Sequence, residues 1–216
     1  RWEFYHQKEV KGGFDIDLLN DITKGGLSKK TLNIALAGTG VGKSMFMCHC
    51  AAANLRDNKN VLYITLEMAE ERIAERIDAN LMGVTIDEVH MFPQDVYDKK
   101  INRMRQNHKG KIVIKEYPTT GAGANHFRYL LNELKIKRNF VPDVVYVDYL
   151  NICMSARIKY GAGVNSYTYI KAIAEELRGL AVEYDVPVVS ATQTTRSGYT
   201  SSAVSYTHLR AHETLR

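Results

Sequence analysis

The amino-acid sequence predicts an α/β fold in which helices flank a mostly parallel central sheet. Its 216 residues are enough for one large domain with a sizeable core. From residue 31 onward, short runs rich in β-branched residues alternate with longer amphipathic stretches. The first of these runs ends in a glycine-rich loop that leads into a helical segment. Repeated strand–helix units of this kind indicate a parallel sheet.

Composition excludes several classes of protein. The chain is 45% hydrophobic and 25% charged with only 4 prolines, and no apolar run reaches the length of about 18 residues that a membrane span needs. The net charge of +5 fits an anionic partner, and it fits a mildly basic metabolic enzyme equally well. Cys48, Cys50 and Cys153 are odd in number and lack metal-binding spacing, which favours a reducing intracellular compartment. No signal-peptide pattern opens the sequence, so we expect a cytoplasmic protein without membrane contact.

The first strand–helix unit surrounds the glycine-rich loop. Residues 31–38 (TLNIALAG) are apolar and end in glycines, which predicts a strand running into a tight loop. A helix is expected over residues 44–55. Residues 61–67 (VLYITLE) predict the next strand.

Two helices are expected after that strand. Residues 69–82 carry Ile73 and Ile77 at four-residue spacing with charges between them, which predicts an amphipathic helix. Thr85 and Glu88 have the spacing of a capping box, so a further helix should begin at their position.

The second half of the chain repeats the same rhythm. Residues 111–117 predict a strand, residues 125–138 a helix, and residues 143–152 a nearly continuous apolar strand interrupted by an acid. A strand of that composition is expected to be covered on both faces. A long helix over residues 166–184 and a strand over residues 186–193 complete the pattern.

The glycine-rich loop has the residues of a phosphate-binding loop, or P-loop. Because it follows a predicted strand and opens a predicted helix, its backbone N–H groups can face an anion. Lys43 would neutralise β/γ-phosphate charge, and Ser44 offers a hydroxyl to Mg²⁺. The first position is Ala37 where the pattern has glycine, and a chance glycine turn is the alternative. The candidate ATP-binding residues are Gly38, Thr39, Gly40, Val41, Gly42, Lys43 and Ser44.

Three polar residues end the later strands, where ligands bind in parallel α/β sheets. Asp148 is expected to hold Mg²⁺ together with Ser44, although an acid there could also cap the following turn. Glu67 could deprotonate the water that attacks the γ-phosphate. Gln193 could sense the γ-phosphate and move the loop after it. Taken alone, acids and amides at strand ends are also commonly just solvated.

Two loops carry basic and aromatic residues suited to single-stranded nucleic acid. Arg157, Lys159 and Tyr160 follow the Asp148 strand, and Arg196 and Tyr199 follow Gln193. Such residues can track phosphates and stack on bases. Exposed basic loops also occur simply for solubility.

The last residues break the pattern. Residues 204–216 (VSYTHLRAHETLR) show no helix or strand period and resemble a translated sequencing-adapter read-through. We therefore expect them to be foreign to the protein, with a natural tail as the alternative.

The motifs together resemble a known family. GGLSKKTLNIALAGTGVGKS, VLYITLEMAEE, VVYVDYL and VVSATQTTR occur in this order, and each is similar to a motif of the DnaB-like hexameric replicative DNA helicases, whose motor domain has a RecA-like fold. The likeness is strongest to the T-even phage members and runs over about residues 14–203.

The resemblance implies a function and a set of partners. It implies that Glu67, Lys43 and Gln193 are catalytic, with Gln193 as the sensor, and that ATP and Mg²⁺ are used to move along single-stranded DNA. It also implies a six-subunit ring, primase and loader partners, and the cytoplasm of a phage-infected bacterium. Residues 1–203 are expected to be a RecA-like motor domain without the family's final strands and arginine finger.

Two other functions share these features. A RecA-like recombinase has the same fold and base position, and it forms open filaments instead of rings. A nucleotide-binding assembly or loader module would keep the phosphate loop without turnover.

Overall fold

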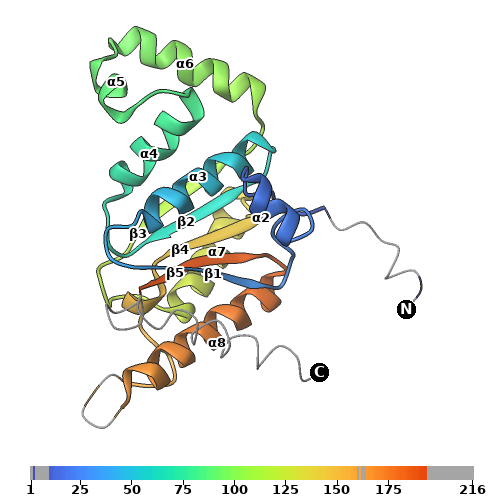
Figure 1. The fold of residues 1–216 in the computed structure, drawn as a ribbon, viewed down its shortest axis with the longest axis vertical. Helices are drawn as coiled ribbons and strands as arrows, with labels where there is room; N and C mark the ends of the chain where they lie inside the picture. Colours follow the sequence, from blue (N-terminus) through green and yellow to red (C-terminus); the bar gives the residue numbers. More distant parts are fainter. Residues whose placement is uncertain (1, 3–9, 160, 162–163, 194–216) are drawn as a thin grey trace.

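The described part of the computed structural model comprises residues 2, 10–159, 161 and 164–193, which fold around a five-stranded parallel sheet. The strand order is β1-β5-β4-β2-β3, so the first strand of the chain lies at one edge beside the last (Figure 1). This confirms the predicted α/β fold with a parallel sheet. The strands are β1 (Leu32–Ala37), β2 (Val61–Thr65), β3 (Ile112–Glu116), β4 (Val144–Asp148) and β5 (Val188–Gln193).

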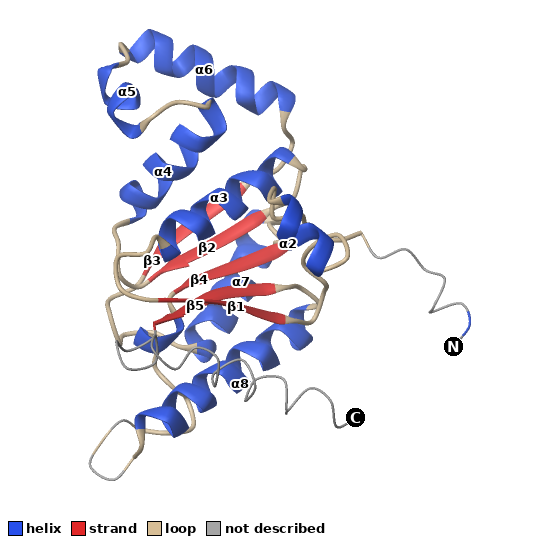
Figure 2. Ribbon diagram, in the orientation of Figure 1, coloured by secondary structure: helices blue, strands red, loops and turns tan. Residues whose placement is uncertain are grey.

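Helices cover both faces of this sheet (Figure 2). One face packs against α3, and the other packs against α7 and α8. The helices are α2 (Asp17–Ile22), α3 (Lys43–Arg56), α4 (Glu70–Met82), α5 (Ile86–Met91), α6 (Gln94–Asn107), α7 (Ala124–Arg138) and α8 (Ser166–Tyr184).

The core has two layers because the central strands are buried on both faces. All five residues of β2 and all five of β4 are buried. Leu62 and Ile64 pack with α7 and α8, whereas Val61 and Tyr63 pack with α3. Alternate side chains of an extended strand point to opposite faces, so a continuous apolar run supplies both layers.

Helices α4, α5 and α6 extend beyond the end of the sheet as an arm (Figure 1). The capping box predicted at the start of α5 is confirmed: the Glu88 carboxylate accepts from the Thr85 amide at 2.7 Å, and Thr85 Oγ1 accepts from the Glu88 amide at 3.2 Å. Tyr97 on α6 donates to Asp78 on α4 at 2.9 Å. Helix α6 is strongly polar and has no buried residue, and it was not predicted from the sequence.

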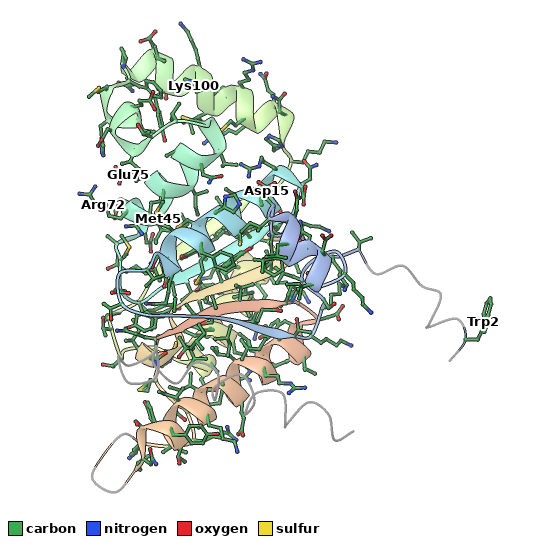
Figure 3. All side chains as sticks on the ribbon, in the orientation of Figure 1. Trp2, Asp15, Met45, Arg72, Glu75 and Lys100 are labelled. Carbon is green, nitrogen blue, oxygen red and sulfur yellow. The ribbon has the colours of Figure 1, made fainter. Side chains whose placement is uncertain are left out.

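The segment before β1 is fastened to α3. Asp15, labelled in Figure 3, accepts from Arg56 at 2.7 Å. The buried Asn54 side chain donates to the carbonyl of Gly13 at 3.2 Å and to the Tyr146 hydroxyl at 3.0 Å. These contacts join the segment before β1 to the core layer between α3 and the sheet.

Two predicted strands end at least two residues earlier than expected. The strand predicted over residues 143–152 ends at Asp148, and Leu150–Ile152 form a 3₁₀ turn. The strand predicted over residues 61–67 ends at Thr65, whose Oγ1 accepts from the Met68 amide at 3.1 Å and donates to the Met68 carbonyl at 2.8 Å. Side-chain bonding of this kind turns the backbone away from the sheet.

None of the helices in the described ranges has the length and apolarity required to cross a membrane.

Candidate nucleotide-binding site

The strand ends bring the predicted site residues to one edge of the sheet. Ala37 at the end of β1 is paired in register with Gln193 at the end of β5, and Thr65 at the end of β2 is paired with Asp148 at the end of β4. Because all the strands are parallel, their carboxyl ends meet at the same edge. Asp148 and Gln193 are the last residues of their strands, and the P-loop and Glu67 follow the ends of β1 and β2.

The P-loop connects β1 to α3. Gly40 and Gly42 have φ values of 73° and 104°, a left-handed conformation that favours glycine. Gly42 is also the N-cap of the 14-residue helix α3, and no side chain caps that end. The first N–H groups of α3 are therefore free to bind an anion at the positive end of the helix dipole.

Lys43 lies across this loop. Its Nζ donates to the carbonyl oxygen of Gly38 at 3.0 Å and lies 5.6 Å from the centroid of the Tyr149 ring. The ammonium group is thus held at the mouth of the loop, where a phosphate would meet it.

Asp148 is fully buried beside the start of α3. The Tyr63 hydroxyl donates to its Oδ2 at 3.0 Å, whereas the buried Oδ1 has no hydrogen-bond partner among the described residues. Burial raises the pKa of Asp148, and the neighbouring Ser44, Tyr63, Arg76 and Lys43 partly offset that rise.

A hard divalent cation fits this donor set. Mg²⁺ prefers hydroxyl and carboxylate oxygens, and Ser44 and the unpartnered Oδ1 of Asp148 provide one of each. An unpaired buried carboxylate oxygen is costly unless a ligand satisfies it. The described residues contain no cluster of three or more His, Cys, Asp or Glu that could hold a metal. We therefore expect phosphate oxygens of the nucleotide to supply further ligands to the cation.

Glu67 and Gln193 flank this centre. Glu67 is exposed in the bend after β2, and Gln193 Nε2 donates to Thr39 Oγ1 in the P-loop. The Gln193 contact joins the end of β5 directly to the phosphate-binding residues.

Tyr149 connects these groups and was missed in the sequence. Its hydroxyl donates to Gln193 Oε1 at 3.4 Å, while its ring lies beneath Lys43. Its pKa is raised by burial, and by the nearby charges of Glu67 and Asp148. An aromatic residue directly after the strand-end acid was the available signal.

Comparison with known proteins places these motifs in a family. The family model described as DnaB-like helicase C terminal domain matches residues 11–203. The chain belongs to this family. It is 48% identical over 208 residues to the DnaB-like replicative helicase of Enterobacteria phage T4, covering 94% of this chain and 43% of the relative. It is also 29% identical over 147 residues to a probable plasmid replicative DNA helicase of Chlamydia muridarum, covering 66% of this chain and 30% of that relative. The chain therefore spans less than half the length of these curated relatives.

Solved structures of DnaB-like and related proteins have the same fold. The ATPase domain of G40P matches with a TM-score of 0.68 at 20% identity, over 89% of this chain and 66% of that one. A DnaB-like replicative helicase described with its interactions with primase matches with a TM-score of 0.67 at 18% identity, over 91% and 46%. The RecA-like fold implied by the motifs is thereby confirmed.

The basic loop residues of this DnaB-like domain lie in different surroundings. Lys159 is exposed and makes no ion pair within the described ranges. Arg157 is paired with Glu175 at 2.7 Å and with Glu176 at 3.3 Å. Tyr160, Arg196 and Tyr199 lie outside the described residues, as does the predicted foreign tail, residues 204–216.

Tyr63 gives a test of the cation site in this domain. Replacing Tyr63 by phenylalanine removes the donor to Asp148 Oδ2, so the carboxylate is held less firmly. Because a hydrogen bond to a charged group contributes about 1.5–3 kcal/mol, we expect roughly a tenfold rise in the Mg²⁺ concentration needed for half-maximal ATP binding. Titration of Mg²⁺ at fixed ATP measures this shift.

Tyr146→Phe is the matched control. Tyr146 is equally buried and stacks on Tyr63 with ring centroids 5.7 Å apart, but its hydroxyl bonds to Asn54 and not to Asp148. Equal shifts in the Mg²⁺ requirement of both variants would show that the loss of any buried hydroxyl has this effect, and would contradict a specific role of Tyr63 at Asp148.

Proposed function

We propose that this chain is the ATP-driven motor of a replicative DNA helicase. The proposal rests on one observation: the P-loop, a buried acid beside Ser44, an exposed acid and an amide all meet at one edge of a parallel sheet. Membership of the DnaB-like family and 48% identity to a phage replicative helicase support it.

The residues have separate roles in binding ATP. The N–H groups of residues 38–44 and the Lys43 ammonium would bind the phosphates. Ser44 and Asp148 would hold Mg²⁺, which would neutralise charge on the β- and γ-phosphate oxygens. Asp148 suits that role because its neighbours leave Oδ1 free.

Coupling hydrolysis to movement needs a general base and a residue that senses whether the γ-phosphate is present. Glu67 would accept a proton from the attacking water, since its exposed carboxylate follows β2 at the same edge as Asp148. Gln193 would contact the γ-phosphate while ATP is bound. After the γ-phosphate has left, Gln193 would return to Thr39, to which it donates in this structure. Tyr149 would move with it, because it bonds to Gln193 and lies beside Lys43.

Binding of single-stranded DNA is assigned to the two loops after β4 and β5. Arg157, Lys159 and Arg196 are the basic residues that we propose contribute to it. We further propose that the whole protein forms a homo-hexameric ring in the cytoplasm of an infected bacterium. Primase and a loader are proposed partners, and a primase is named for one of the structural relatives.

Phosphate release from ATP, with and without single-stranded DNA, tests the proposal. Measured over a range of protein concentrations with the assembly state followed by light scattering, hydrolysis should be stimulated by single-stranded DNA once subunits assemble. Assembled protein that shows no stimulation by DNA would instead favour a nucleotide-binding assembly module.

A further inference from the structure

One carboxylate on α8 organises a bend over residues 155–158, in the loop that follows the 3₁₀ turn after β4. Glu176 Oε1 accepts from the Ser155 hydroxyl at 2.6 Å and from the Arg157 amide at 3.3 Å, and Oε2 accepts from the Ala156 amide at 2.9 Å. The Glu176 side chain is only 9% exposed. A carboxylate that accepts several N–H and O–H donors in a poorly hydrated place fixes the backbone that donates them.

Ser155 extends this turn by one more residue. Its Oγ accepts from the Arg157 amide at 3.2 Å and from the Ile158 amide at 3.1 Å, and its own amide donates to the Tyr169 hydroxyl at 3.2 Å. The amides of residues 155–158 are thus all bonded to side chains of α8 or to Ser155 itself. Lys159, the next residue, is exposed.

Arg157 is part of the same cluster. Its guanidinium donates to Glu175 at 2.7 Å, to the Ala172 carbonyl at 3.0 Å and to Glu176 at 3.3 Å. One positive charge is therefore matched by two negative ones, so the cluster as a whole does not attract a phosphate. Burial would raise the pKa of Glu176, but the hydrogen bonds from Ala156, Ser155 and Arg157 outweigh it and lower that pKa. Glu176 is accordingly an ionised acceptor at neutral pH.

We propose that Glu176 is a positioning residue that fixes the bend over residues 155–158 and so presents Lys159 to single-stranded DNA. Arg157 then contributes to DNA binding by holding the turn to α8, without itself contacting a phosphate. The DNA part of this inference rests on the proposed function, whereas the fixed turn rests on the contacts alone.

Glu176→Gln and Glu175→Gln form a matched pair of variants. Both remove one negative charge from adjacent positions of α8 and leave the side-chain size unchanged. In Glu176→Gln, the new amide N–H₂ group faces donors of residues 155–157, whereas Glu175 makes no contact with those backbone amides. We expect amide hydrogen exchange of residues 155–158 to accelerate about tenfold in Glu176→Gln, the effect of losing one net hydrogen bond to a charged group. Glu175→Gln keeps a side-chain oxygen that can accept from Arg157, so it should leave the exchange of these amides unchanged. Unchanged exchange in Glu176→Gln would overturn the assignment.

Binding of an oligo-dT strand at several salt concentrations then tests the DNA role. Glu176→Gln and Arg157→Ala should each weaken binding about tenfold without changing the salt slope, because Lys159 still contacts its phosphate once the bend is ordered on the bound strand and only the cost of that ordering is added. Together they should weaken binding little more than either alone. Lys159→Ala should reduce the magnitude of the salt slope, the change in log binding constant with log salt concentration, by about 0.7. That is the change expected for one lost phosphate contact on a single strand. A slope that falls by the same amount in Arg157→Ala would show that Arg157 contacts a phosphate and would overturn its assigned role.

The two levels of the inference fail separately. If the unmodified chain does not bind the oligonucleotide, the proposed function is wrong, while hydrogen exchange still decides whether Glu176 fixes the turn. If the chain binds DNA but Glu176→Gln binds as tightly as the unmodified chain, the positioning role is wrong and the proposed function stands. Thermal unfolding of each variant verifies that the fold is retained.

Discussion

Glu67→Gln should bind ATP as tightly as the unmodified chain and hydrolyse it at least about a hundredfold more slowly. General-base catalysis contributes about 10²–10⁴-fold, and glutamine keeps the size of the side chain but cannot take up the proton. Glu67 is exposed in the bend after β2 and bonds to no other side chain in the described part of the chain, so the fold should not change. Nucleotide affinity and single-turnover phosphate release, measured on the same sample, separate binding from chemistry.

Glu71→Gln provides the control for this variant. Glu71 is an exposed acid in the first turn of α4, four positions further along the chain. The Glu71→Gln variant should hydrolyse ATP at the unmodified rate, because Glu71 belongs to α4 and not to the strand ends that carry the site. Equal loss in both variants, or no loss in either, would remove Glu67 from its assigned role.

Lys43→Ala should weaken triphosphate binding by roughly tenfold to a hundredfold. A charge-assisted hydrogen bond contributes about 1.5–3 kcal/mol, and Lys43 is the cation placed over the P-loop. In the folded protein it bonds to the carbonyl of Gly38 and lies over the Tyr149 ring, so its removal costs the fold one hydrogen bond and this ring contact. Fluorescent nucleotide titration measures the affinity.

Lys109→Ala is the corresponding control. Lys109 is an exposed cation after α6, and its amide donates to Asn58 beyond the carboxyl end of α3, the end of that helix opposite the P-loop. An affinity unaffected by Lys43→Ala, or reduced equally by Lys109→Ala, would contradict the phosphate assignment.

The sheet and the main site residues could be predicted from the sequence, because both depend on short apolar runs and on the residues directly after them. The apolar runs of β2, β4 and β5 lead into Glu67, Asp148 and Gln193, and parallel strands bring their ends to one edge. Asp148 and Gln193 could be singled out for this reason. Glu67 could be singled out too, although its strand ends two residues before it.

Other features depend on which residues become neighbours across the sheet. Tyr63 reaches Asp148 across adjacent strands, 85 positions apart in the chain. Glu176 meets Ser155 only because α8 folds back beside the loop after β4. No spacing rule predicts such pairs, since they depend on register and packing. The predicted DNA-contacting role of Arg157 could not have been weighed without seeing that Glu175 and Glu176 already pair with it.

Calorimetric titration of ATP into the 216-residue chain, with Mg²⁺ and then with EDTA, tests the proposed nucleotide site most directly. If Ser44 and the free Oδ1 of Asp148 hold the cation beside the P-loop, one ATP should bind per chain and its affinity should fall at least about tenfold when Mg²⁺ is removed. No binding, or the same affinity in EDTA, would contradict the site.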